Sequence, residues 1–266
     1  MHTATYTWLV SLVASLAVLA GCGGGDEPAT GGTTGSTASL GGTVTVFAAA
    51  SLTDAFQKLG DGFEAAHPDV TVQVSFGGSS ALREQILSSA PADVFASANE
   101  SNMQAVVDAG AVTGRATPVA TNQLQIAVPP DNPGNVTGLA DFAKPDLLIG
   151  LCAEEVPCGQ FGREALSRAA VEPSVDTNET DVRSLLTKIE AGDLDAGIVY
   201  RTDVLAAGDK VRGIDIPAEQ NIVAVYPIAV LAASKNHTAA GAFVSYVRSA
   251  TGQSILQSFG FGPPPA

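Results

Sequence analysis

The chain of 266 residues carries a formal net charge of −14, and 45% of its residues are hydrophobic. This acidity argues against a nucleic-acid-binding protein, because phosphate contacts need clustered Lys and Arg side chains. The length suits one large domain or two modest lobes, and beyond the N-terminus no segment reaches the roughly 18 consecutive apolar residues of a membrane-spanning helix.

Residues 1–21 read as a lipoprotein signal peptide. The segment "WLVSLVASLAVLA" is apolar apart from its serines, which is typical of a secretory hydrophobic region and too short to span a membrane unaided. It runs into "LAGC", a quartet that resembles the lipobox in which the cysteine, here Cys22, is lipidated. Residues 1–8 contain no Lys or Arg, which departs from the usual signal pattern. The alternative is a buried core helix with an accidental cysteine.

Residues 22–42 then form a linker of Gly, Thr and Ser with almost no apolar side chain. Such a composition cannot repay the entropy of ordering, so we expect a flexible tether. An anchor followed by a tether predicts an extracytoplasmic protein that is lipid-anchored to the cell membrane.

From residue 43 onward, short β-branched runs alternate with amphipathic stretches. Strands are predicted over residues 43–48, 70–76, 93–97, 124–128, 147–151, 196–200 and 223–231. Helices are predicted over residues 52–66, 81–88, 99–109, 159–170 and 181–191, from 202 for a short stretch, and over 239–248 and 253–259. This alternation predicts an α/β fold with mostly parallel strands.

Two of the predicted strands end in small residues and a serine just before a helix. Ser51 follows the strand in "FAAASLTDAF", and Ser79 follows the strand in "VSFGGSSAL". A helix start offers unpaired N–H groups and partial positive charge, and is therefore a ready anion site. Serine is also an ordinary helix N-cap, so a purely structural interpretation of both residues stays open.

Three further positions fit the same pattern. Cys158 precedes a helix in "VPCGQFGREAL", and Val182 begins another in "ETDVRSLL". Tyr200 closes the strand "AGIVY", at the carboxyl edge where α/β proteins bind ligands. Each signal is weak alone, and none of them requires a bound cation.

The three cysteines have different expected fates. Cys22 is the lipid anchor. Cys152 and Cys158 lie close together in the sequence, and an extracytoplasmic compartment favours a disulfide between them. Free thiols and a metal-binding pair remain the alternatives.

The quoted segments, with "PADVFASANESNM" and "YPIAVL", resemble the periplasmic molybdate-binding proteins of ABC importers, in the right order and over nearly all of residues 43–262. The resemblance implies a two-lobed class II periplasmic-binding-protein fold. It implies a tetrahedral molybdate or tungstate dianion between the lobes, held by neutral hydrogen-bond donors. No cofactor, no protein-ligated metal cation and no catalysis are implied.

Carried over by position, the resemblance assigns the anion to a set of hydroxyl and backbone N–H donors on Ser51, Ser79, Cys158, Val182 and Tyr200. Some relatives have alanine at the position of Cys158, where only the amide is needed. The resemblance also implies a partner permease in the membrane, and we expect the binding protein itself to be a monomer.

We expect lobe 1 to comprise residues 43–120 and 226–266, and lobe 2 to comprise residues 121–225. Two crossovers, near 121–123 and 225–227, would act as hinges. The sequence does not rank molybdate against tungstate, and a sulfate or phosphate receptor is the nearest alternative.

Two classes of protein other than an oxyanion receptor remain as alternatives. A secreted serine hydrolase would use Ser51 or Ser79 with His67 or His237, but the chain lacks a G-x-S-x-G nucleophile elbow. A surface adhesion protein would show no affinity for small anions.

Overall fold

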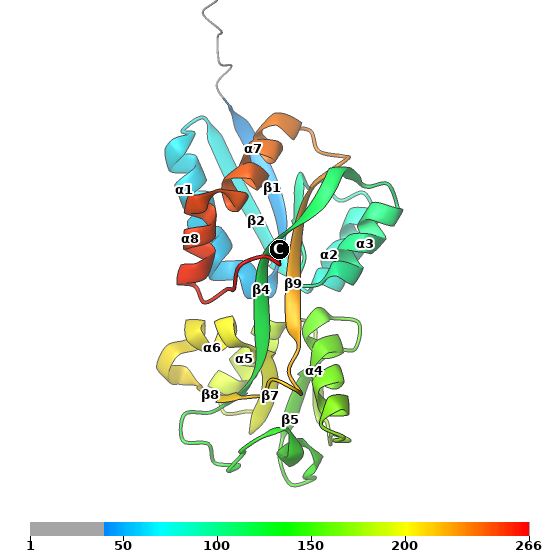
Figure 1. Ribbon diagram of the computed structural model, residues 1–266, viewed down its shortest axis with the longest axis vertical. Helices are drawn as coiled ribbons and strands as arrows, with labels where there is room; N and C mark the ends of the chain where they lie inside the picture. The colour runs from blue at the N-terminus through cyan, green and yellow to red at the C-terminus, as the bar shows by residue number, and fades with distance from the viewer. Residues whose placement is uncertain (1–39, 266) are drawn as a thin grey trace, which may run out of the picture. The chain divides into compact units, whose positions relative to one another are not determined.

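Two long antiparallel strands, β4 (Val112–Val128) and β9 (Val223–Leu231), run side by side along the computed structural model (Figure 1). The structure describes residues 40–265, which belong to one compact unit, Ser39–Ala266. The signal peptide, Cys22 and the linker up to residue 39 lie outside the described residues.

The other strands are short. They are β1 Gly42–Ala49, β2 Val70–Gly77, β3 Val94–Ala96, β5 Ile149–Cys152, β6 Thr177–Glu179, β7 Ala196–Tyr200 and β8 Arg212–Asp215. The order in the sheet is β2-β1-β3-β9-β4-β7-β5-β6, and β8 also pairs with β4.

The α-helices are α1 Thr53–Ala66, α2 Ser79–Leu87, α3 Glu100–Asp108, α4 Pro157–Arg168, α5 Val182–Glu190, α6 Arg201–Ala207, α7 His237–Arg248 and α8 Ala250–Ser258. Short 3-10 helices span η1 Ala50–Leu52, η2 Leu139–Ala143 and η3 Gly208–Lys210. Within residues 40–265 we find no helix with the length and apolar character needed to cross a membrane.

Two groups of elements flank the long strands. The β1 side consists of β1–β3 with α1–α3, α7 and α8, and the β7 side consists of β5–β8 with α4–α6 (Figure 1). On the β1 side, Val46 of β1 pairs with Val74 of β2 and Val94 of β3, so β1 is covered by a strand on both edges. Val46, Phe47, Ala48 and Ala49 are all buried, which explains why the second half of β1 is apolar on both faces.

The two predicted hinge segments lie near each other in the ladder between β4 and β9. Thr121 pairs with Val225, and Gln123 pairs with Val223. Hinge motion and the limits of the two lobes stay predictions.

The sheet contains both parallel and antiparallel strand pairs, whereas mostly parallel pairs were predicted. The pairs β1–β2, β1–β3, β5–β6 and β5–β7 are parallel, whereas all pairs that involve β4 or β9 are antiparallel. β4 also starts at Val112 instead of residue 124. Its first half mixes polar and apolar residues, contains Gly114 at φ 75° and Pro118, and has irregular register, so it lacks the alternation of a regular strand.

Three aromatic side chains fix α1 against α7 in the core of the β1 side. Phe243 makes edge-to-face contacts with Phe56 and Phe63, at centroid distances of 6.3 and 5.4 Å. All three are fully buried, and such pairs add about 0.5–1.5 kcal/mol beyond the area that they bury.

We therefore expect Phe243→Ala to lower the free energy of unfolding by about 3–5 kcal/mol, because it leaves a cavity between two helices. Leu148→Ala is the control, since Leu148 is 51% exposed and should change stability by less than about 0.5 kcal/mol. Denaturant unfolding measures both. Equal small losses in the two variants would contradict the assigned core.

Candidate functional site

Six strands direct their carboxyl ends at one cavity. β1, β2 and β3 approach from the β1 side, and β5, β6 and β7 approach from the β7 side. The residues that line the cavity are Ala49, Ala50, Ser51, Gly77, Gly78, Ser79, Ala98, Val156, Pro157, Cys158, Asp181, Val182 and Tyr200. Ligands of α/β proteins bind at this edge of the sheet.

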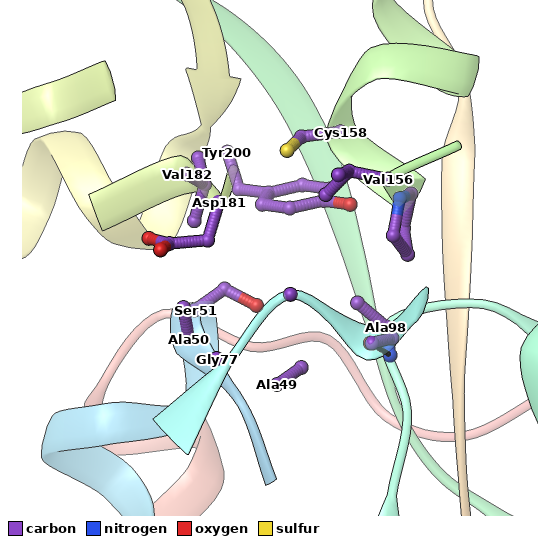
Figure 2. A pocket seen from close by; sticks show the side chains of 13 residues that line it. Ala49, Ala50, Ser51, Gly77, Ala98, Val156, Cys158, Asp181, Val182 and Tyr200 are labelled. Atoms are coloured by element: carbon purple, nitrogen blue, oxygen red, sulfur yellow. Dashed lines mark hydrogen bonds between the residues drawn. The ribbon is translucent and has the colours of Figure 1, made fainter. Parts of the chain in front are cut away.

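The structure brings all five residues of the predicted site together. Figure 2 shows Cys158, Val182 and Tyr200 on one side of the cavity and Ser51 on the other. Ser79 lines it from the β1 side as the first residue of α2.

The cavity is small because most of its lining residues are small. Its empty space is ≈ 200 Å³, part of it open to solvent, and Ala49, Gly77 and Ala98 contribute no bulk. A cavity this narrow suits a small ion rather than an extended organic ligand. The alanines before Ser51 thus keep the ends of the strands narrow.

Four helical segments begin at the cavity. Val182 is the first residue of α5, Cys158 the second of α4 and Ser79 the first of α2, while Ser51 lies in η1. Amide N–H groups in a first turn have no acceptor within their own helix. The helix dipoles add partial positive charge at the same point, so the cavity attracts an anion.

The two serines do not cap these helices. The N-cap residues are Ala49 for η1 and Gly78 for α2, and neither helix start shows a side-chain cap. α5 is different, because Asp181 accepts hydrogen bonds from the amides of Arg183 and Ser184. The purely structural interpretation of Ser51 and Ser79 as caps is therefore wrong.

Each serine hydroxyl instead forms a hydrogen bond with a residue of another element. Ser51 Oγ lies 2.9 Å from the hydroxyl of Tyr226, and Ser79 Oγ accepts a hydrogen bond from the Ala98 amide at 3.0 Å. Both serines are buried. These contacts leave each hydroxyl able to form a further hydrogen bond toward the cavity.

Tyr200 has a buried hydroxyl that finds no hydrogen-bond partner among the described residues. Burial raises the pKa of this hydroxyl well above its usual range, and Tyr226 and Asp203 add to the rise. Tyr200 therefore keeps its proton at neutral pH. An unpaired buried hydroxyl costs free energy, about 1–3 kcal/mol, unless a ligand supplies the partner.

Charged side chains stand next to the cavity but pair with each other. Arg183 contacts Asp54 at 2.5 Å and Asp203 at 3.1 Å. Asp203 is fully buried, and burial raises its pKa to about 6 against the opposing pull of the Arg183 guanidinium. Asp181 lines the cavity, with its carboxylate pointing away from the Tyr200 hydroxyl (Figure 2).

Contacts across the cavity hold the β1 side against the β7 side. Besides the pair of Arg183 and Asp54, the Asn99 side chain donates to Gln160 Oε1 at 2.9 Å. Gly78 sits so close to the other side that an added Cβ would lie 2.5 Å from the carbonyl oxygen of Thr180.

A disulfide joins Cys152 at the end of β5 to Cys158 in the first turn of α4, with Cα atoms 5.7 Å apart. The predicted pairing is confirmed against free thiols and a metal pair. The loop is tight, since a Cβ on Gly159 would lie 1.9 Å from the carbonyl oxygen of Ala153. The bridge thus restrains the loop that carries the Cys158 amide.

Tyr226 and Ala98 also support the site, although no role at the site is predicted for either residue from the sequence. Both lie within segments that carried the family resemblance, "YPIAVL" and "PADVFASANESNM". Their contacts with Ser51 and Ser79 join residues far apart in the sequence, so no local pattern marks them.

Comparisons with known proteins agree with this architecture. A family model described as bacterial extracellular solute-binding protein matches residues 44–262. The molybdate-binding protein ModA of Mycobacterium tuberculosis is 38% identical over 221 residues, which are 83% of this chain and 85% of that protein.

Two solved structures share the fold. The periplasmic molybdate-binding protein of Azotobacter vinelandii has a TM-score of 0.73 at 19% identity, over 84% of this chain and 100% of that one. The sulfate-binding protein SubI of Mycobacterium tuberculosis has a TM-score of 0.75 at 20% identity, over 83% of this chain and 86% of that one. The predicted α/β class and two-lobed binding-protein fold are confirmed.

The fold and the cavity define a protein that encloses a small solute between two sides of one sheet. The chain belongs to the bacterial extracellular solute-binding protein family. Members of this family are binding proteins rather than enzymes.

The disulfide between Cys152 and Cys158 should stabilise the fold. We expect the variant with both Cys152→Ala and Cys158→Ala to lose about 2 kcal/mol of unfolding free energy, because a short closed loop no longer restrains the unfolded chain. Denaturant unfolding measures the loss. A reductant should destabilise the wild type and leave the variant unchanged, and a variant as stable as the oxidised wild type would contradict the prediction.

Proposed function

We propose that the protein is the extracytoplasmic substrate-binding component of a molybdate ABC importer. It binds the tetrahedral dianion in the cavity and delivers it to a permease in the membrane. The observation that carries this proposal is the convergence of neutral donors from both sides of the cavity. One of them is the Tyr200 hydroxyl, which has no hydrogen-bond partner within residues 40–265. The curated relatives named for molybdate support the choice of ligand.

The assigned donors are the hydroxyls of Ser51, Ser79 and Tyr200 and the amides of Cys158 and Val182. The two serines also offer their own backbone N–H groups. A dianion with four oxygens accepts several hydrogen bonds at once, and bonds to a charged group contribute about 1.5–3 kcal/mol each. The set needs no counter-charge in contact with the ligand.

The disulfide serves the same site by fixing the Cys158 amide before the ligand arrives. Restraint of a donor in its bound geometry lowers the entropic cost of binding. We accordingly expect the double cysteine variant to bind molybdate more weakly as well as to unfold more easily. Unchanged affinity in a folded variant would contradict this role.

The lipid anchor belongs to the same proposal. Lipidation at Cys22, at the start of the Gly-, Thr- and Ser-rich linker, would keep a monomeric receptor at the outer face of the membrane next to its permease. Mass spectrometry of the protein extracted from membranes tests this, since lipidation adds diacylglyceryl mass to a chain that starts at Cys22.

A serine hydrolase is disfavoured by the positions of the histidines. Neither His67, which ends α1, nor His237, which begins α7, lines the cavity that holds Ser51 and Ser79. A nucleophilic serine needs a general base within hydrogen-bond reach.

Titration calorimetry with sodium molybdate, tungstate, sulfate and phosphate tests the proposal. We expect saturable binding of molybdate with one site per chain. Tighter binding of sulfate would make the protein a sulfate receptor, and no binding of any oxyanion would refute the assignment. Molybdate and tungstate are nearly the same size, so the sequence does not show which binds more tightly. The calorimetry compares their affinities directly.

We expect Ser51→Ala and Tyr200→Phe to fold and to weaken molybdate binding by about 1–3 kcal/mol each, because each removes one donor to the anion. Matched controls are Ser245→Ala and Tyr246→Phe on α7, which do not line the cavity and should leave the affinity unchanged. Wild-type affinity in both site variants would refute the assignment of the site.

Gly78 tests whether binding requires the closed arrangement. Gly78→Ala should weaken molybdate binding by about 1–3 kcal/mol, because its Cβ collides with the Thr180 backbone only when the two sides meet. Gly60→Ala is the matched control, since Gly60 lies on α1 outside the cavity lining and a Cβ there makes an ordinary contact of 3.5 Å with Val72. Equal affinities in the two variants would contradict closure around the ligand.

A further inference from the structure

Tyr226 contacts Ser51, a residue that lines the cavity. It lies on β9, its side chain is fully buried, and its hydroxyl is 2.9 Å from Ser51 Oγ. Tyr226 does not line the cavity itself. Its edge-to-face contacts with Tyr200 and Phe261, at centroid distances of 6.0 and 5.5 Å, hold the ring in place.

Asn122 sets the direction of the hydrogen bond between Tyr226 and Ser51. Asn122 Oδ1 accepts from the Gln123 amide at 2.9 Å, which turns the amide nitrogen toward Thr202 Oγ1 at 2.8 Å and the Tyr226 hydroxyl at 3.4 Å. An amide nitrogen can only donate. The Tyr226 oxygen therefore accepts from Asn122, which leaves its one hydrogen available to be donated to Ser51 at 2.9 Å.

Tyr226 also keeps that hydrogen. Burial raises the pKa of its hydroxyl above the usual range, and the charge of Asp203 adds to the rise. The hydrogen bonds with Ser51 and Asn122 lower the pKa without cancelling the rise, so the Tyr226 hydroxyl keeps its proton at neutral pH.

A serine hydroxyl that accepts a hydrogen bond from Tyr226 has its own single hydrogen left for the cavity. Ser79 is arranged in the same way, since its oxygen accepts from the Ala98 amide. The acceptor sites of Asp181 are used elsewhere. Oδ1 accepts from the Arg183 and Ser184 amides, and Oδ2 accepts from the hydroxyls of Ser184 and Thr180.

We propose that Tyr226 is a positioning and specificity-determining residue, which fixes Ser51 as a hydrogen-bond donor and thereby restricts the cavity to oxyanions that carry no proton. An anion with a proton would have to place its O–H group against a donor, and the unmatched pair would oppose binding. This inference rests on the proposed binding of an oxyanion at Ser51. It assigns the selectivity to a residue that does not touch the ligand.

A double-mutant cycle tests the positioning role. Calorimetry with sodium molybdate is carried out on the wild type, Ser51→Ala, Tyr226→Phe and the variant with both changes. We expect Tyr226→Phe to weaken binding about 3- to 10-fold in the wild type and to have less than about a twofold effect once Ser51 is alanine, because the two residues act as one unit.

The matched control is Tyr246→Phe, which removes a tyrosine hydroxyl on α7 away from the cavity. It should leave the affinity for molybdate unchanged, and thermal unfolding shows whether each variant is folded. Equal effects of Tyr226→Phe with and without Ser51 would overturn the proposal, as would an effect no larger than that of Tyr246→Phe.

Hydrogen phosphate, which carries a proton at neutral pH, tests the specificity role. The concentration of sodium phosphate that displaces half of the bound molybdate is measured for the wild type and Tyr226→Phe. We expect phosphate to compete at least about threefold better in the variant relative to molybdate, because Ser51 Oγ is then free to accept the proton of the anion. An unchanged ratio would overturn the specificity role.

The outcomes separate this inference from the proposed function. A wild type that binds no molybdate contradicts the proposed function. A wild type that binds molybdate through Ser51, but shows no coupling between Ser51 and Tyr226, contradicts only the role of Tyr226.

Discussion

An anion removed from water must find a hydrogen-bond donor wherever it loses a water molecule, because unmatched polar groups in a buried site cost several kcal/mol. The arrangement of strands and helices in this protein supplies such donors at one place. Parallel strands end at one edge of a sheet and feed helices whose first N–H groups lack partners. Here two such edges face each other, one on the β1 side and one on the β7 side, because β4 and β9 run past both. The donors of Ser51 and Ser79 then meet those of Cys158, Val182 and Tyr200.

The parts of the site that could be predicted from the sequence are those with a local signature. A strand followed by small residues and a helix start is visible in the segments around Ser51 and Ser79, without knowledge of the sheet. The missed parts depend on tertiary contacts. β6 and β8 are short and polar, and the first half of β4 owes its pairing to β9 rather than to its own pattern. Tyr226 belongs to the same class, since its hydroxyl meets a serine 175 positions away in the sequence.

The chain has a net charge of −14, which would repel a dianion. That repulsion is weak inside the cavity. At physiological ionic strength the field of surface carboxylates decays over about 8 Å. The N–H and O–H groups around the cavity act at hydrogen-bond distance, in a buried place where screening is weak. The acidity therefore bears on solubility and on the rate of encounter, whereas affinity is decided by the direction of a few fixed dipoles.

Asp203 and Arg183 do not line the cavity, but they hold two of its neutral donors in place. Asp203 accepts a hydrogen bond from the Tyr200 amide through Oδ2 at 3.0 Å, and its Oδ1 pairs with Arg183 at 3.1 Å. Arg183 directly follows Val182, so one buried carboxylate ties together the two elements that carry the Tyr200 hydroxyl and the Val182 amide. The burial that raises the pKa of Asp203 is a cost to the fold. The result is a fixed geometry, since both groups are held by a carboxylate that does not line the cavity.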